Sequence, residues 1–431
     1  MGKSYLVERF GKACFDNVVA VDFERHPGLA DLFESRSPEE IVAVLEVRLR
    51  GSITPGKTLL FLDEIQAAPS AFASLRYFHE EMPELHVIAA GSLLEIVLGD
   101  AAVSVPVGRI EFLHLGPMLF DEFLQAVGEE RLGRLLAETA PGAPLDPALH
   151  EQATKRLKQY LAIGGMPAVV QAFLDRGSYR ECHEVQQALI TTIQDDFAKY
   201  KGRLDPARLR AVFARIPRLV GSKFKFANVD REARARDLKP ALEALVHARV
   251  AHRVPHTSCS GVPLGATESD RHFKVLFMDV GLFSASSGLN LADLVQAEDI
   301  LRVNAGAVCE QFVGQQLIGT LPEYIPPNLH YWMREARTSS AEVDYVIADG
   351  TRIFPIEVKA GKAGTLRSIH QFLRAKNGTV AVRLNADPPT IAESEIELPG
   401  HGKMSFALLS LPLYMASQVR RLCSEWDRGV E

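Results

Sequence analysis

The sequence predicts an α/β protein with several domains. The unbroken apolar run at 59–62, which ends in two acids, and the mostly apolar segment at 85–90 are typical of strands in a buried parallel sheet. Alternating apolar and polar residues at 341–348 and 352–360 predict strands with two different faces. A chain of 431 residues is too long for one ordinary core, so we expect about three domains.

The first residues carry part of a phosphate-binding motif. Gly2, Lys3 and Ser4 open an amphipathic helix and match the last three positions of a P-loop, GxxxxGK[ST]. In that motif the lysine reaches the β- and γ-phosphates, the serine hydroxyl holds Mg²⁺, and the helix N-terminus faces the phosphates. The earlier glycine and strand of the motif are not present, so we expect that the chain begins inside the P-loop and that tight nucleotide binding needs residues before Met1.

Two carboxylates end the first buried strand. Residues 59–62 run directly into Asp63 and Glu64, and one strand, at 18–22, separates them from the P-loop segment. In P-loop hydrolases the first acid holds Mg²⁺, directly or through water, and the second polarises the attacking water. The alternative is a core strand followed by a solvated helix cap.

Several segments in order resemble one family. GKS, LLFLDEIQ, AAGSLLE, VGRIEFLHLGPMLFDEFL and YLAIGGMPAVV look like a large family of prokaryotic AAA+-like ATPases with a C-terminal PD-(D/E)xK nuclease-like domain of unknown function. The resemblance covers almost the whole chain and implies an ATPase core at 1–140. It implies that Lys3 and Ser4 end the P-loop, that Asp63 and Glu64 form Walker B, and that Ser92 senses the γ-phosphate. Ser92 is equally suited to capping the next helix.

A helical lid is expected next. The Pro/Gly/Ala-rich stretch at 140–148 predicts a linker. Helices are then expected at 147–163, 167–175 and 179–199, so the lid spans 147–200.

Residues 199–239 carry concentrated positive charge. They contain 13 Lys/Arg against 4 Asp/Glu, a net charge of +9 that leaves −15 for the rest of the chain. Expected helices at 206–215, 230–235 and 238–247, followed by a β-prone segment, predict a winged helix-turn-helix at 201–262. We expect this segment to contact nucleic acid, with DNA the first candidate. Winged helices also serve as protein-interaction modules, which remains the alternative.

The C-terminal part, 270–420, predicts a restriction-endonuclease-like α/β domain. A helix at 305–317 carries Glu310, one strand carries Asp344, and the next carries Glu357 and Lys359. This is the PD-(D/E)xK pattern, in which Asp344 and Glu357 would bind Mg²⁺, Glu310 would complete the acidic cluster, and Lys359 would orient water for phosphodiester attack. The alternative is ordinary polar alternation on a half-exposed sheet.

These patterns lead to one functional expectation and two alternatives. From the motifs above we expect a protein that uses ATP and Mg²⁺ and couples ATP hydrolysis to nucleic acid. We expect it to be cytoplasmic, because five scattered cysteines form no disulfide framework and no apolar run is long enough to span a membrane. Oligomerisation is left open. One alternative is a DNA-binding, regulatory or protein-interaction module with a non-catalytic nuclease-like scaffold. The other is an ATPase switch that acts on protein partners.

Overall fold

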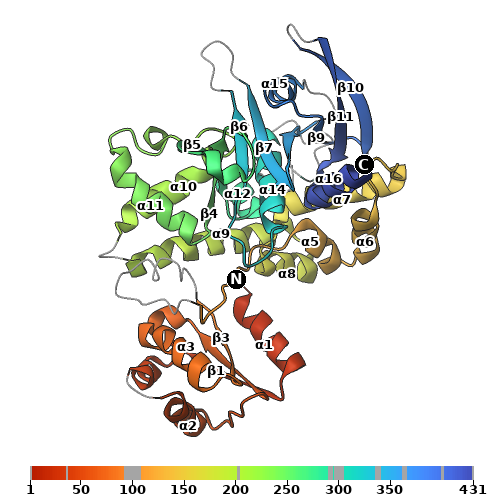
Figure 1. Ribbon diagram of the computed structural model, residues 1–431. Helices are drawn as coiled ribbons and strands as arrows, with labels where there is room; N and C mark the ends of the chain where they lie inside the picture. Colours follow the sequence, from red (N-terminus) through yellow and green to blue (C-terminus); the bar gives the residue numbers. More distant parts are fainter. Residues whose placement is uncertain are drawn as a thin grey trace. The chain divides into compact units, whose positions relative to one another are not determined.

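The computed structural model describes residues 2–34, 37–91, 108–200, 204–289, 295, 305–334, 341–361, 366–398 and 402–429. The chain forms two compact units, one of residues 1–115 with 247–249, the other of residues 116–246 and 250–431 (Figure 1). Each unit is described by itself below.

The first unit is built on a three-stranded parallel sheet. Its strands are β1 (Asn17–Asp22), β2 (Thr58–Asp63) and β3 (His86–Ala89), in the order β1-β2-β3. Asp22 lies opposite Asp63 in the β1–β2 register, so both strands end at the same edge of the sheet. The central strand β2 is buried from its first residue to Leu62, as the apolar run predicts.

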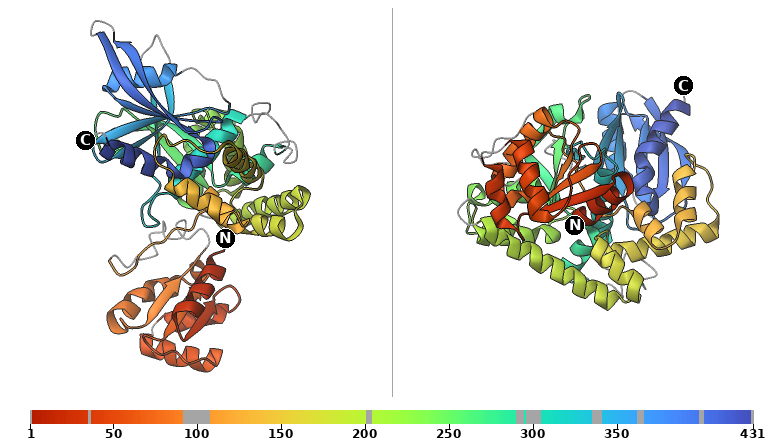
Figure 2. Two further views of the ribbon diagram at one scale, coloured as in Figure 1. Left: turned by 90° about the vertical axis from the view of Figure 1, so that its right-hand side faces the viewer. Right: turned by 90° about the horizontal axis from the view of Figure 1, so that it is seen from below.

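Helices surround this sheet (Figure 2). They are α1 (Lys3–Cys14), a 3-10 helix at Pro27–Phe33, α2 (Pro38–Leu49) and α3 (Pro69–Glu81). The first of them, α1, lies close against the sheet, because a Cβ on Gly11 would meet Val18 Cγ2 at 2.3 Å and Leu59 Cδ2 at 3.0 Å. Glycine in mid-helix is normally unfavourable, and here the close approach of helix and strand explains it.

The second unit contains an eight-stranded sheet in the order β10-β11-β9-β8-β7-β6-β4-β5. Its strands are β4 (Ala251–Thr257), β5 (Glu268–Phe277), β6 (His330–Met333), β7 (Glu342–Asp349), β8 (Arg352–Val358), β9 (Val380–Asn385), β10 (Thr390–Leu398) and β11 (Gly402–Pro412). Strand β7 carries one extra residue, because Val346 pairs with His330 and Val343 with Trp332. Bulges of this kind redirect nearby side chains.

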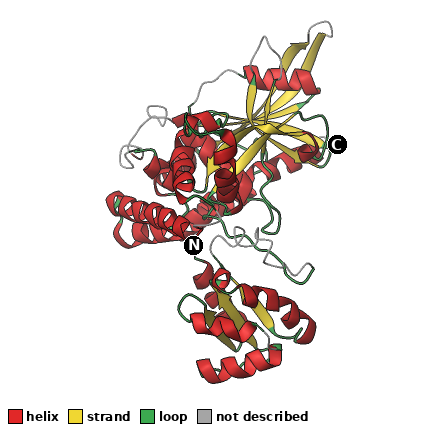
Figure 3. Cartoon of the chain, turned by 90° about the vertical axis from the view of Figure 1, so that its left-hand side faces the viewer, coloured by secondary structure: helices red, strands yellow, loops and turns green. Residues whose placement is uncertain are grey.

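Helices pack on this sheet and extend beside it (Figure 3). They are α5 (Phe120–Ala126), α6 (Glu130–Glu138), α7 (Pro147–Ile163), α8 (Pro167–Arg176), α9 (Tyr179–Asp196), α10 (Pro206–Arg215), α11 (Ala235–His247), α12 (Val280–Ser286), α14 (Ala305–Gly319), α15 (Arg367–Lys376) and α16 (Val419–Gly429). A core cluster joins α15 to the sheet through Phe372, Trp332 and Val343. Helix α14 contacts β5 and β8 instead.

Two segments far apart in sequence meet around Asp279. The Asp279 carboxylate is buried and accepts hydrogen bonds from the backbone N–H of Gly165 at 2.7 Å and of Leu282 at 2.9 Å. A Cβ on Gly165 would lie 2.1 Å from the carbonyl oxygen of Met118. The Gly164-Gly165 turn therefore has a packing role: it brings backbone N–H groups to a buried carboxylate that would otherwise be costly.

The expected winged segment differs from the structure in two respects. The helix expected at 230–235 is absent, because the Asp230 carboxylate accepts hydrogen bonds from the N–H groups of Glu232 and Ala233 and forms a turn, after which α11 begins at Ala235. The hairpin of β4 and β5 also crosses the expected boundary at 262–270 and joins the same sheet as β6, β7 and β8. Apart from residues 247–249, the segments expected as lid, winged helix and C-terminal domain lie in one compact unit.

Candidate functional site

The first candidate site lies at the carboxyl edge of the parallel sheet. Ser4, in the first turn of α1, donates a hydrogen bond from its hydroxyl to Asp63 Oδ2 at 2.7 Å. The Lys3 ammonium donates to the carbonyl oxygen of Gly91 at 2.5 Å, just beyond β3. The structure therefore brings together the P-loop residues and the strand-end acids, although 59 positions separate Ser4 from Asp63.

Local backbone geometry sets up this edge. Gly2 is left-handed, with φ 71°, and leads into α1, so the first N–H groups of the helix are left for a ligand or water. Glu64 is also left-handed, with φ 51°, an uncommon conformation for a residue with a side chain. It turns the chain sharply at the end of β2, and the Glu64 N–H donates to Asp63 Oδ1 at 3.1 Å.

Glu64 is held by Gln66, which the sequence analysis did not single out. The Gln66 amide nitrogen donates a hydrogen bond to Glu64 Oε2. A Cβ on Gly91 would lie 2.4 Å from Gln66 Oε1, so only glycine fits there without moving that amide. The last residue of the DEIQ segment was the available signal, since Gln66 lies two positions after the carboxylate that it orients.

These residues fit a magnesium-bound nucleotide. A hydroxyl and a carboxylate oxygen, already 2.7 Å apart, are the hard oxygen ligands that Mg²⁺ takes in P-loop hydrolases. Asp63, Glu64, Lys3 and Ser4 are all only partly buried, so ligands can reach them. Ser92, the expected γ-phosphate sensor, lies outside the described residues.

The second candidate site brings together all four residues expected in the C-terminal part. Glu310 lies on α14, Asp344 on β7 and Glu357 on β8, with Lys359 just beyond the strand. The Lys359 ammonium pairs with Glu357 Oε1 at 2.5 Å, and Asp344 Oδ2 accepts a hydrogen bond of 2.8 Å from the backbone N–H of Val358. Glu357 Oε2 is buried without a hydrogen-bond partner among the described residues.

A further lysine lies at the centre of this cluster. Lys274, on β5, places its ammonium 2.7 Å from Glu342 Oε1, 3.4 Å from Glu310 Oε2 and 3.6 Å from Asp344 Oδ1. Its side chain is only 3% exposed, and its nitrogen lies 5.4 Å from the centre of the Tyr331 ring. The cluster that the sequence predicts as a metal site thus contains a buried internal cation.

Sequence reasoning missed Lys274 and Glu342, although a signal was present. Lys274 interrupts an apolar run, FKVLF at 273–277, between Phe273 and Val275. Lysine is almost never fully buried unless it is paired, so this position predicts acidic partners. Glu342 alternates with Asp344 on the same strand and supplies the closest one.

The electrostatics follow from this burial. Burial alone would lower the pKa of Lys274, but the carboxylates of Glu310, Asp344 and Glu342 outweigh it and raise that pKa. Burial, reinforced by the nearby Asp344 carboxylate, raises the pKa of Glu310 to about 7 and that of Glu357 to about 7. Lys274 therefore stays protonated, and its positive charge interacts favourably with the three surrounding carboxylates.

The expected metal at this second site does not fit the described side chains. Across the described ranges, no group of three or more His, Cys, Asp or Glu residues is arranged to hold a metal ion. The oxygens of Glu310, Glu342 and Asp344 surround an ammonium group instead. That Glu310, Asp344 and Glu357 form a metal-ligand set stays a prediction, and Lys274 lies beside two of these acids, Glu310 and Asp344.

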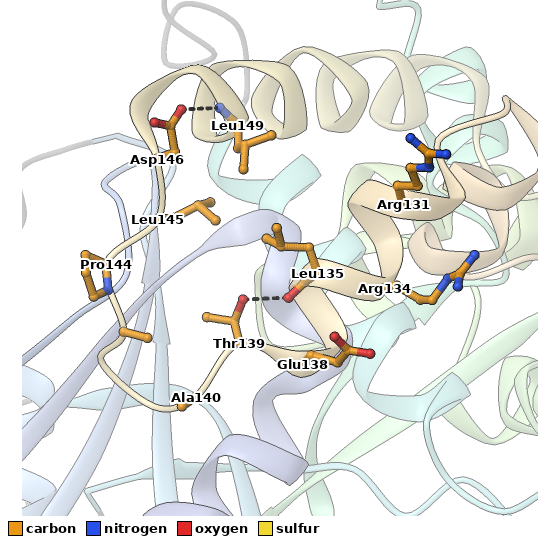
Figure 4. Close-up of a pocket in the computed structure, with 11 residues that line it drawn as sticks. Arg131, Arg134, Leu135, Glu138, Thr139, Ala140, Pro144, Leu145, Asp146 and Leu149 are labelled. Carbon is orange, nitrogen blue, oxygen red and sulfur yellow. Dashed lines mark hydrogen bonds between the residues drawn. The ribbon is translucent and has the colours of Figure 1, made fainter.

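A separate groove lies in the second unit, beside the expected linker (Figure 4). It has a volume of about 590 Å³ and is lined by residues between Arg131 and Leu149 from α6, the following loop and the start of α7. Asp146 caps α7 by accepting a hydrogen bond from the N–H of Ala148 at 2.9 Å. The linker is thus packed between two helices, and its lining residues come from neither carboxylate site.

Comparisons with known proteins agree with part of this picture. Residues 1–124 match the family model described as an AAA domain. The N-terminal segment is similar to AAA domains. This match supports a nucleotide-binding, ATPase-like function for the chain. Residues 154–293 and 305–393 match two family models described as domains of unknown function, DUF8612 and DUF4143.

Other comparisons add little. No curated protein matches the sequence. The crystal structure of protein VC1899 from Vibrio cholerae is 11% identical over 95% of this chain and 97% of that chain, with a TM-score of 0.18, which is too low to support an argument. Within the part of the chain that the structure describes, no helix has the length and apolarity needed to cross a membrane.

Proposed function

We propose that the first unit binds ATP with Mg²⁺ and hydrolyses it at the edge formed by α1, β2 and β3. The observation that carries this proposal is the 2.7 Å hydrogen bond between the Ser4 hydroxyl and the Asp63 carboxylate, because it joins the two motif residues that such hydrolases use for the metal. The match of residues 1–124 to an AAA domain supports the same assignment.

Each residue has a definite role in this proposal. Lys3 leaves the Gly91 carbonyl and pairs with phosphate oxygens, while the first N–H groups of α1 donate to the phosphates. Ser4 and Asp63 hold Mg²⁺, which neutralises charge on the phosphates. Glu64, kept in place by Gln66, accepts a proton from the attacking water.

Glu64→Gln in the full-length protein tests this assignment. We expect hydrolysis to fall by about 10²- to 10³-fold because the water-activating group is lost. ATP affinity should stay within about threefold, since the amide is isosteric and makes no contact required for binding. Radiolabelled phosphate release and calorimetric ATP titration measure the two quantities. Unchanged hydrolysis in the variant would make this strand end structural and overturn the assignment.

We further propose that the second unit binds nucleic acid and that nucleotide state modulates this binding. Support comes from the net charge of +9 at 199–239 and from exposed cations on and near α10 and α11. Lys225 and Arg234 are exposed and form no ion pair within the described chain, so they are available for phosphate contacts. Lys223 and Arg236 instead pair with Glu342 and Asp237.

A scaffold role for the C-terminal acidic cluster is the second candidate. It is favoured by the position of Lys274, which already compensates Glu310, Glu342 and Asp344. In this view β5, β7 and α14 are joined by the cluster, and nucleic-acid contact occurs on the neighbouring basic segment without cleavage. An incubation of plasmid DNA with the protein and Mg²⁺ tests it, and cleavage abolished by Asp344→Asn would exclude the scaffold role.

A further inference from the structure

The strongest unexplained feature outside the nucleotide site is the environment of Lys274. Three carboxylate oxygens, from Glu342, Glu310 and Asp344, lie 2.7, 3.4 and 3.6 Å from its ammonium nitrogen. Glu342 and Asp344 lie on β7 and Glu310 lies on α14, so one strand and one helix supply these oxygens. The Tyr331 ring lies on a further side.

We propose that Lys274 is the resident cation of this cluster and that it excludes divalent metals from the second unit. The ammonium supplies the positive charge that a metal would supply, and it occupies the space between the oxygens that would ligate one. A divalent ion entering beside it would face a second positive charge within a few ångströms, which is costly in a buried place.

The way that the lysine is positioned supports this inference. Its backbone lies in an edge strand, paired to β4 opposite Val254, and its side chain is 3% exposed. Gly221 (φ 78°) lies over the cluster from another side, because a Cβ on it would come within 3.3 Å of Glu310 Oε1. Phe224 then stacks on Phe273, next to Lys274, at 5.5 Å between ring centres. The basic segment thus packs over the cluster and covers the lysine.

The remaining acid has a different partner. Glu357 pairs with Lys359 through Oε1, while its buried Oε2 lacks a hydrogen-bond partner among the described residues. Glu357 Oε2 is therefore the atom most suited to bind a metal ion. The competing hypothesis is that a metal ion binds between Asp344 and Glu357. The proposal requires that no such ion binds while Lys274 is present.

A Mn²⁺ titration of the full-length protein decides between these hypotheses. The electron paramagnetic resonance signal of unbound Mn²⁺ measures how much Mn²⁺ the protein binds. The samples contain no nucleotide and carry Asp63→Asn, which removes the contribution of the first site. We expect the Asp63→Asn protein to show no Mn²⁺ site tighter than about 1 mM. A tighter site that disappears when Asp344→Asn is added would overturn the proposal, whether or not any lysine variant folds.

The positive arm is Lys274→Met in the same background. We expect it to gain about one Mn²⁺ site per chain, at least about tenfold tighter than any in its parent, and to lose that site again with Asp344→Asn. Lys403→Met is the matched control, because it removes an exposed ion pair of 2.9 Å with Glu395 and should gain nothing. A folded Lys274→Met protein that binds Mn²⁺ no better than its parent would contradict the proposal.

Discussion

The two sites both contain carboxylates and a lysine, but they place the lysine differently. At the first site, Lys3 donates to the Gly91 carbonyl, and the oxygens of Ser4 and Asp63 face each other without a cation between them. At the second, Lys274 lies among Glu342, Glu310 and Asp344. The position of the lysine, more than the presence of acids, therefore distinguishes the two sites.

Removal of Lys274 should give the largest effect. We expect Lys274→Met to lower the free energy of unfolding by about 3–5 kcal/mol, because it removes a buried cation from three partly buried carboxylates. Lys403→Met, at an exposed pair, should cost less than about 1 kcal/mol. Urea denaturation of both variants measures the difference, and equal, small losses would show that the buried lysine does not stabilise the cluster.

The first site should respond to a single oxygen ligand. Asp63→Asn should weaken Mg²⁺-dependent ATP binding by about 10- to 100-fold, because a neutral amide replaces a charged metal ligand. Asp344→Asn should leave it unchanged. Calorimetric titration with ATP in the presence and absence of Mg²⁺ separates the metal contribution, and a loss caused by Asp344→Asn would reverse the roles of the two sites.

The sequence predicted the first site better than the second for a physical reason. Asp63 ends an apolar run, and parallel strands present their ends at one edge, so its meeting with the N-terminus of α1 follows from local patterns. Lys274 meets its partners only because β5 forms a hairpin with β4, and β4 pairs with β6, in a sheet order that periodicity does not specify. The apolar residues around Lys274 in the sequence indicate that it is buried, but they do not indicate which acids it contacts.

The basic segment offers an intermediate test of the second unit. Reversing the charge of Lys225 and Arg234 should weaken binding to duplex DNA by about tenfold or more at low salt and reduce the slope of log affinity against log salt by about 2. Lys223 and Arg236 have acidic neighbours, so their reversal should cost less. Arg180→Glu is an exposed control, on α9 and outside the basic segment. Fluorescence anisotropy across salt concentrations provides the slopes. An affinity for DNA that does not change when Lys225 and Arg234 are reversed would indicate a protein-interaction surface.

The smallest effect concerns the pH dependence of stability. The pKa of Glu310 is about 7 in the folded chain, above its ordinary value, so the folded state holds this proton more tightly than the unfolded state. Stability should therefore fall as the pH rises through the interval between the ordinary value and about 7, and the loss should be complete above it. Glu310→Gln should reduce this fall by about 1–3 kcal/mol, and we expect Glu357 to account for the remainder. Urea denaturation at about pH 5 and about pH 8 measures the change, and an identical pH dependence in parent and variant would contradict the assignment.

The most direct test of the contrast between the two sites is the number of Mn²⁺ ions bound with a non-hydrolysable ATP analogue. Equilibrium dialysis of the full-length protein, Asp63→Asn and Asp344→Asn provides this number. We predict about one nucleotide-dependent Mn²⁺ per chain, lost in Asp63→Asn and retained in Asp344→Asn. Retention in Asp63→Asn together with loss in Asp344→Asn would place the metal in the second unit and contradict the account.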